Sequence, residues 1–177
     1  MDKSIKLLMI FAFFHIHILG TMQAQENHDL RKIETVINLT RFFDWSQNES
    51  FNHSGKMLYV LTDIKSKINF EMGNQTSANY KDWKVVCSDK ILDFDNGSVV
   101  FITKSKEKYV PGIIVLSHEK NILTIAENND DFCKRGGMIN IKGINGQPKF
   151  EINYRIIQDK SLDISSKLLA LSKIYQQ

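Results

Sequence analysis

The sequence predicts a single-domain α/β sandwich: a central, mostly parallel sheet of about five to six strands with helices on both faces, closed by a C-terminal strand pair plus helices. Three observations support this fold class. Short apolar segments that suit buried strands alternate with segments of helical periodicity. Two segments near the C-terminus alternate apolar and polar residues, as strands with one buried face do. No repeat, long linker or low-complexity run divides the 177 residues, so one domain is expected.

The first 24 residues have the features of a cleaved signal peptide, which leaves residues 25–177 as the folded domain. Lys3 and Lys6 make the start basic, residues 7–19 are apolar except for His15 and His17, and Ala24 offers a small residue at the cleavage point. The alternative is a membrane anchor, but the apolar run is shorter than the roughly 20 residues that a spanning helix needs. We therefore expect export, to the periplasm or beyond.

The net charge argues against one class of function. The chain has 23 Lys and Arg against 20 Asp and Glu, a formal net charge of +3 that decreases when residues 1–24 are removed. Such a small excess does not indicate nucleic acid binding or strong attraction to anionic lipid. A domain of this length can bury a core that is stable without disulfides.

An apolar stripe at helical spacing predicts a helix over residues 29–45. Trp45 at its end is either a ligand-stacking platform or, as is commoner at such a position, a side chain that packs on the core. A strand is expected over residues 56–61, a helix from residue 64 to residue 72, and a polar loop over residues 73–79. The helical stripe comprises Leu30, Ile33, Val36, Ile37, Leu39, Phe42 and Phe43.

Three strands are predicted next, over residues 83–87, 98–103 and 121–126. The second is nearly all apolar, which indicates burial on both faces. Between the second and the third, residues 113–116 would suit a strand, whereas Pro111 suits the first turn of a helix. We predict a helix within residues 104–117 and a polar loop over residues 127–135.

The C-terminal region changes from strand to helical periodicity. Strands are expected over residues 138–142 and 149–154, around a turn at residues 145–146. Ile156 and Ile157 begin the helical spacing and indicate a first helix after the second strand. Ser165 or Ser166 is then placed to cap a second, terminal helix. We expect this helix to bury one stripe against the sheet. The stripe comprises Leu168, Leu171 and Ile174.

The sequence contains no catalytic or metal-binding motif that we identify: no P-loop, G-x-G-x-x-G or nucleophile elbow, and no paired histidines after residue 24. His28, His53 and His118 are far apart in predicted polar segments, where solvated histidines are the common case. We therefore expect no catalytic residue, no metal and no cofactor.

Two polar features have both a structural and a functional interpretation. Gly136 and Gly137 could present backbone N–H groups to an anion, but backbone freedom at a strand entrance is the favoured interpretation. Glu151 and Asn153 alternate with apolar residues on a strand, so they face either solvent or a satisfied buried network. They could bind a ligand or a helix N-terminus, and a structural role is favoured.

Four blocks of the sequence resemble the signature of the YfiR family of secreted bacterial regulators. The blocks are Arg41-Phe42-Phe43-Asp44-Trp45, Gly136-Gly137-Met138-Ile139, Phe150-Glu151-Ile152-Asn153 and Leu162-Asp163-Ile164-Ser165-Ser166-Lys167-Leu168-Leu169. The resemblance covers most of the chain from about residue 30 and implies an α/β sandwich with a central sheet and a helix within residues 104–117. It assigns mostly structural roles to the motif residues Trp45, Gly136, Gly137, Met138, Phe150, Glu151, Asn153, Ser165, Ser166, Leu168 and Leu169.

The two cysteines, Cys87 and Cys133, leave a disulfide open. Export and an even cysteine count favour pairing. The family resemblance implies cysteines elsewhere, one opening the strand that begins here with Ser98 and a pair near the double glycine. Only Cys133 is close to such a position, and Asn140 stands where its partner is expected. We therefore expect the fold to be stable without a disulfide.

Three functions follow as hypotheses. The resemblance implies a non-enzymatic extracytoplasmic regulator that binds and restrains a membrane signalling protein, a diguanylate cyclase in cyclic-di-GMP signalling or a sensor kinase, with a homodimer as an option. The second hypothesis is a periplasmic small-ligand receptor that uses a cleft at the carboxyl ends of the strands. The third is a thiol enzyme that uses Cys133, against which the missing motifs argue.

Overall fold

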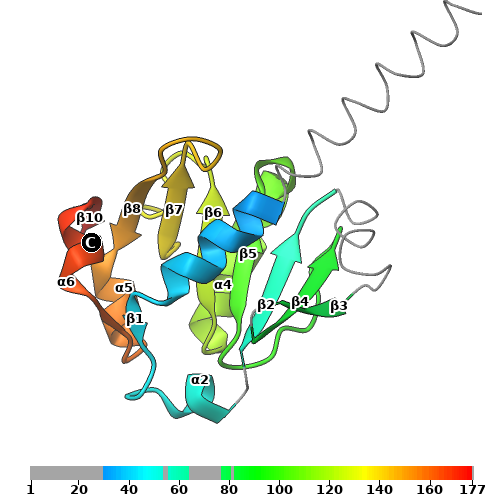
Figure 1. Ribbon diagram of the computed structural model, residues 1–177, viewed down its shortest axis with the longest axis horizontal. Coiled ribbons are helices and arrows are strands. Elements are labelled where there is room, and N and C mark those ends of the chain that lie inside the picture. The colour runs from blue at the N-terminus through cyan, green and yellow to red at the C-terminus, as the bar shows by residue number, and fades with distance from the viewer. Residues whose placement is uncertain (1–29, 54–55, 64–76, 81, 177) are drawn as a thin grey trace, which may run out of the picture.

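A computed structural model describes residues 30–53, 56–63, 77–80 and 82–176 of the chain. Within these residues the fold is an α/β sandwich built on one large sheet, with helices on its two faces (Figure 1). The predicted fold class is confirmed. The sheet has eight strands in the described residues, in the spatial order β10-β8-β7-β6-β5-β2-β4-β3, so it is wider than the five to six strands expected.

Five neighbouring strands of the sheet, from β7 across to β4, are parallel to one another. The edge strand β3 is antiparallel to β4, and β8 is antiparallel to β7. β10 is parallel to β8 and forms the other edge. The bounds are β2 Met57–Leu61, β3 Ser77–Tyr80, β4 Trp83–Ser88, β5 Val99–Ile102, β6 Leu123–Glu127, β7 Ile139–Lys142, β8 Lys149–Asn153 and β10 Ser172–Tyr175.

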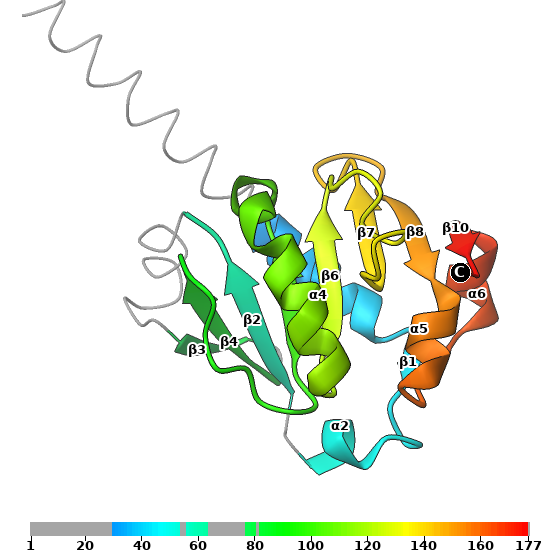
Figure 2. The same ribbon diagram turned by 180° about the vertical axis from the view of Figure 1, so that it is seen from behind.

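The helix over residues 30–40 crosses one face of the sheet (Figure 1), and α4 (Val110–Glu119) covers the opposite face (Figure 2). A strand between the two helices contributes side chains to the core on both faces of the sheet, because successive side chains point to opposite faces. In β2, Leu58 and Val60 pack in the core with the first helix, whereas Tyr59 and Leu61 pack in the core with α4. Two-sided burial explains why β5 is apolar at every position.

The first helix is shorter than predicted, because it ends at residue 40 and not at Trp45. The chain then forms β1 (Phe43–Asp44), which pairs antiparallel with β9 (Asp163–Ile164). The indole N–H of Trp45 donates to the carbonyl of Thr40 at 3.2 Å, and so satisfies a carbonyl at the helix end that has no partner within the helix. Pairing with a segment more than 100 residues away in the sequence ends the helix.

The middle of the chain follows the prediction closely. The strands expected around residues 56–61, 83–87, 98–103 and 121–126 are confirmed as β2, β4, β5 and β6. The predicted helix with proline in its first turn is α4, preceded by the 3-10 helix η1 (Lys104–Tyr109). The helix expected over residues 64–72 lies outside the described residues. The loop expected over residues 73–79 is wrong at its end, where β3 begins at Ser77.

The extent of the last helix is also wrong. Strands β7 and β8 are confirmed, and so are the two helices expected after them, α5 (Tyr154–Asp159) and α6 (Ser166–Ala170), although α6 ends at Ala170. Beyond Ala170 the chain becomes β10, where Ile174 pairs with Ile152 of β8. The predicted stripe is therefore divided: Leu168 is 1% exposed, whereas Leu171 is 73% exposed. Pairing between β10 and β8 satisfies backbone hydrogen-bonding groups of both strands. This stabilisation outweighs the helix that the spacing of the apolar residues predicts.

Candidate functional site

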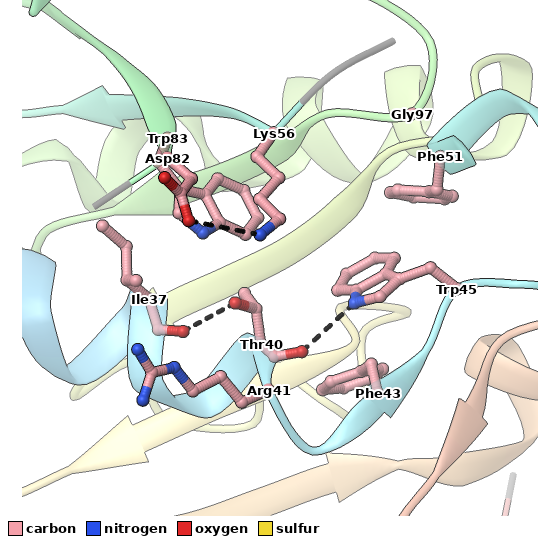
Figure 3. A pocket seen from close by; sticks show the side chains of 10 residues that line it. All are labelled: Ile37, Thr40, Arg41, Phe43, Trp45, Phe51, Lys56, Asp82, Trp83 and Gly97. Carbon is pink, nitrogen blue, oxygen red and sulfur yellow. Dashed lines mark hydrogen bonds and ion pairs between the residues drawn. The ribbon is translucent and has the colours of Figure 1, made fainter. Parts of the chain in front are cut away.

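The candidate site is a pocket at the amino-terminal edge of the parallel strands (Figure 3). Three of its lining residues lie at or shortly before the start of a strand: Lys56 before β2, Trp83 at the start of β4, and Gly97 two residues before β5. The end of the first helix and the segment around α2 (Glu49–His53) form the other walls. The cavity has a volume of about 600 Å³, which is in the range of small-ligand sites.

Four aromatic rings line this pocket: Phe43, Trp45, Phe51 and Trp83. Trp45 lies between two of them, with ring centroids 5.4 Å from Phe43 and 4.9 Å from Phe51 (Figure 3). These distances are in the range of favourable aromatic pairs. The cluster gives the pocket a rigid apolar wall that suits a flat or branched apolar group.

The mouth of the pocket carries charge. Arg41 lies at the end of the first helix, is exposed, and its guanidinium has no hydrogen-bond or ion-pair partner among the described residues. Lys56 and Asp82 form a loose ion pair of 3.9 Å, with side chains 59% and 86% exposed. Two cations and one carboxylate therefore surround an aromatic cavity, which favours an occupant that combines an apolar group with a negative charge.

The carboxyl-terminal edge of the same strands has a different character. Glu127, at the end of β6, forms an ion pair of 2.8 Å with Lys32 of the first helix and accepts the backbone N–H of Lys104 at 3.2 Å. Thr103 donates its N–H and its hydroxyl to the carbonyl of Leu61, which joins β5 to β2. These polar groups bind one another. The aromatic pocket lies at the opposite edge from the cleft that the receptor hypothesis uses.

Comparison with models of known protein families shows the family of the chain. The YfiR/HmsC-like model matches residues 31–173. The chain belongs to the YfiR/HmsC-like family. No curated protein matches the chain significantly.

The motif residues of this YfiR/HmsC-like chain occupy two kinds of position. Arg41, Phe43 and Trp45 of the first block line the pocket, and Trp45 also packs against the core. The indole ring of Trp45 thus belongs both to the edge of the core and to the wall of the pocket. Two of the later blocks lie in or next to β7 and β8. The last block places Asp163 and Ile164 in β9, which pairs with β1 of the first block.

The double glycine is required by geometry. Gly136 has a φ of +101°, which side-chain-bearing residues rarely adopt. A Cβ on Gly137 would lie 2.3 Å from Cε1 of Phe132, whose ring is fully buried. The pair therefore allows a tight entry into β7, where Met138 is fully buried. This geometry supports the interpretation of backbone freedom.

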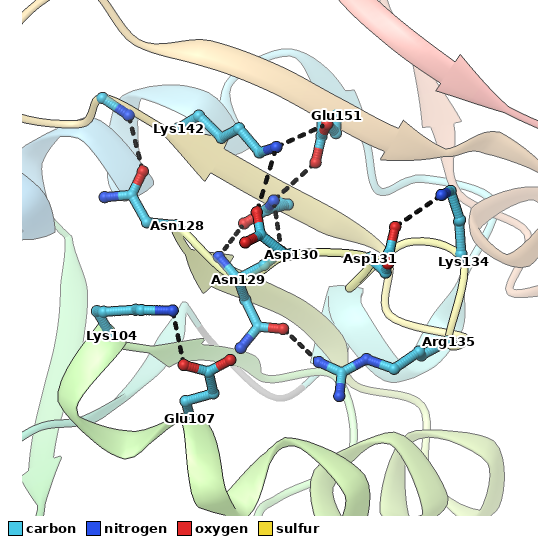
Figure 4. A network of polar contacts seen from close by, with 12 residues as sticks. Lys104, Glu107, Asn128, Asn129, Asp130, Asp131, Lys134, Arg135, Lys142 and Glu151 are labelled. Carbon is cyan, nitrogen blue, oxygen red and sulfur yellow. Dashed lines mark hydrogen bonds and ion pairs between the residues drawn. The ribbon is translucent and has the colours of Figure 1, made fainter.

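Glu151 belongs to a satisfied buried network (Figure 4). Asn140 donates from Nδ2 to Glu151 Oε2 at 2.7 Å and to the carbonyl of Asn129 at 2.8 Å. Lys142 forms a 3.3 Å ion pair with Glu151 Oε1, and the hydroxyl of Tyr175 in β10 lies 3.4 Å from the same oxygen. The hydrogen bond to Glu151 is the main cause that raises the pKa of Lys142. The network connects β7, β8, β10 and the loop after β6.

Asn153 connects β8 to the helix that follows. Its Oδ1 accepts the N–H of Ile156 at 3.3 Å as the N-cap of α5, and its Nδ2 donates to the carbonyl of Cys133 at 2.8 Å. Capping of a helix N-terminus is one of the uses that the sequence suggested. Ser165 caps α6 by accepting the N–H of Lys167 at 3.3 Å. Of the remaining motif residues, Phe150 and Leu169 are half-buried against the core and Ser166 is exposed.

Both cysteines are free, buried and on opposite sides of the sheet. Cys87 belongs to the core under the first helix, and Cys133 belongs to the core under α4. Burial raises the pKa of each thiol to about 12. The Cys133 thiol donates to the carbonyl of Glu151 at 3.3 Å. A buried, protonated thiol is a poor nucleophile, which argues against the thiol-enzyme hypothesis.

Of the three histidines after residue 24, the structure describes the side chain of His118 alone. His118 is exposed on α4, and His28 lies outside the described residues. No group of three or more His, Cys, Asp or Glu side chains among the described residues is arranged to hold a metal ion. In the same residues, no helix is long and apolar enough to cross a bilayer.

Sequence reasoning missed most of the pocket. It identified Trp45 as a candidate platform, but it gave no reason to connect that ring with Phe51, Lys56 or Trp83. These residues come from three segments that only the sheet order brings together. The one available signal was the density of aromatic residues between residues 42 and 51.

Proposed function

We propose that this chain is a non-enzymatic regulator that acts outside the cytoplasmic membrane. In this proposal it binds the extracytoplasmic domain of a membrane signalling protein, a diguanylate cyclase, and holds it in an inactive arrangement. Membership of the YfiR/HmsC-like family over residues 31–173 is the observation that carries the proposal. The signal-peptide features of residues 1–24 support the location.

The mechanism needs no chemistry from the chain. A regulator shifts a partner between two arrangements only by binding one of them more tightly than the other. A 100-fold difference in affinity corresponds to about 2.7 kcal/mol, which a few well-packed aromatic contacts and one ion pair can supply. The aromatic pocket with Arg41 at its mouth is the surface with these properties that we assign to binding.

The test measures cyclic-di-GMP in cells that lack the chain. Loss of a restraint on a cyclase should raise the cyclic-di-GMP level, and expression of the chain from a plasmid should lower it again. An active cyclase must be the source, so the rise should disappear when the candidate membrane cyclase is also deleted. Unchanged cyclic-di-GMP in the first strain contradicts restraint of a cyclase.

The pocket favours a second candidate function, a periplasmic receptor for a small ligand. A cavity of about 600 Å³ with four aromatic rings is large enough for such a molecule. The two functions differ in what removal of the chain does. Loss of a receptor component impairs a response to one compound, whereas loss of a restraint raises signalling without any added compound.

A further inference from the structure

A second hollow adjoins the aromatic pocket. It has a volume of about 350 Å³ and lies along the paired strands β1 and β9. Arg41 and Phe43 contribute to both hollows, so the two share a wall. Phe42, which is 37% exposed, lines only the second one. A small molecule needs one cavity, whereas two adjoining hollows suit a chain that lies across both.

We propose that the two hollows together bind an extended segment of a partner protein, with an aromatic side chain in the larger hollow and an acidic residue next to it on Arg41. The inference rests on the proposed function, because it identifies where that partner binds. The segment also carries a basic residue several positions away from the acidic one, which lies in the second hollow.

The aromatic preference follows from the walls of the larger hollow. Trp45 is held between Phe43 and Phe51, so its ring is fixed before any ligand arrives. Trp83, only 8% exposed, closes another side. A ring inserted here gains stacking contacts without ordering flexible side chains, and buried aromatic anchors contribute much of the affinity at protein interfaces.

The order of charges follows from the two rims. Arg41 has no partner in the described residues, and Lys56 is only loosely paired with Asp82, so the rim of the larger hollow has excess positive charge. The second hollow is lined by Asp44 and Asp163, both exposed. A hydrogen bond from the backbone of Ser46 lowers the pKa of Asp44, which keeps this carboxylate ionised. A bound segment therefore complements these charges when its acidic residue lies at the rim of the larger hollow and its basic residue lies in the second hollow.

The chain contains its own reporter for this inference. It has two tryptophans, and both Trp45 and Trp83 line the larger hollow. The probe is the capped peptide Ser-Glu-Phe-Ser-Ser-Lys-Ser, titrated into the domain while tryptophan fluorescence is recorded. Its matched control is Ser-Lys-Phe-Ser-Ser-Glu-Ser, which has the same composition and net charge but places the basic residue beside the aromatic ring.

We expect a saturable fluorescence change with the first peptide and about tenfold weaker binding of the charge-exchanged peptide, a difference of about 1.4 kcal/mol. Arg41→Gln should abolish the difference between the peptides. The control Arg155→Gln removes an exposed arginine on α5, outside both hollows, and should retain the difference. Circular dichroism of each variant verifies that it is folded.

Three results would overturn the inference: no fluorescence change with either peptide, equal affinity for both, or an undiminished difference in Arg41→Gln. Phenylacetate is titrated in parallel. If it saturates the signal as tightly as the first peptide, the site is for a small aromatic acid and not for a protein segment.

A cellular comparison separates this inference from the proposed function. If the wild-type chain fails to lower cyclic-di-GMP while the peptides still bind selectively, the proposed function is wrong and the partner is not a cyclase, but the binding site stands. If wild-type chain lowers cyclic-di-GMP and Arg41→Gln lowers it equally at the same abundance, the function stands and the binding site is wrong. We expect only the wild-type chain to lower it.

Discussion

Trp45 shows how one side chain can pack against the core and line a pocket at the same time. Its indole N–H binds the last carbonyl of the first helix, its ring packs between two phenylalanines, and the same ring lines the pocket. From sequence, these roles looked like alternatives. They are compatible because the helix ends at residue 40, and the following turn places Trp45 at the border between the core and the pocket.

Gly137 provides a test of close packing at a single residue. Gly137→Ala would bring a Cβ to 2.3 Å from the buried ring of Phe132, so we expect a loss of about 1–3 kcal/mol in the free energy of unfolding. Gly112→Ala in α4 is the matched control, because the nearest atom to its Cβ is 3.4 Å away. It should stabilise the domain by up to about 1 kcal/mol through helix propensity. Urea denaturation measures both; equal effects would show that the approach to Phe132 is unimportant.

The two thiols predict how stability depends on pH. Burial raises the pKa of Cys87 and of Cys133 from 9.0 to about 12, so the unfolded chain loses these protons at lower pH than the folded one. Their contribution is complete below pH 9 and is lost as the pH rises toward 12. We expect the Tm to fall above about pH 9, and Cys87→Ala, though less stable overall, to show a shallower fall. An identical slope in the variant would contradict this assignment.

The same thiols test for a disulfide. We expect two labels per chain when the unreduced protein is denatured in the presence of a thiol reagent, and slow labelling in the native state because a protonated, buried thiol reacts poorly. A monomer that takes up no label until it is reduced would show a bond between Cys87 and Cys133.

At the scale of elements, the pairings that the sequence could not reveal lie at the ends of the sheet. Strands β2, β4, β5 and β6 were predictable, because burial on both faces or on one face leaves a pattern in each segment. β1, β9 and β10 are short and depend on partners far away in the sequence. Local periodicity around residues 166–175 therefore suggested one helix, where the chain forms a short helix and an edge strand.

The divided C-terminal stripe gives a prediction for neighbouring leucines. Leu168 is 1% exposed and Leu171 is 73% exposed. Leu168→Ala should cost about 2–5 kcal/mol of unfolding free energy, whereas Leu171→Ala should change it by no more than about 0.5 kcal/mol. Thermal denaturation of the isolated domain measures both variants. A large loss of unfolding free energy in Leu171→Ala would contradict the exposed position of Leu171 and support the longer terminal helix that the periodicity predicted.

For the whole molecule, the sequence predicted the layers of the fold better than the place of the site. Parallel α/β sheets commonly bind ligands at the carboxyl ends of their strands, and this chain has polar groups there that bind one another, such as Glu127 and Lys32. Its aromatic pocket lies at the amino ends. The pocket depends on the order of the strands in space, which brings the start of β4 beside the end of the first helix, and no local pattern encodes that order.

The central claim is that the chain restrains a cyclase from outside the cytoplasmic membrane. The most direct measurement compares cyclic-di-GMP in cells without the chain that receive either the full sequence or a version starting at Gln25 without residues 1–24. We predict that only the full sequence lowers cyclic-di-GMP, and that mass spectrometry finds its extracytoplasmic product starting near Gln25. If the version without residues 1–24, folded and equally abundant, lowers cyclic-di-GMP as well, the chain acts from inside the cell and the claim is contradicted.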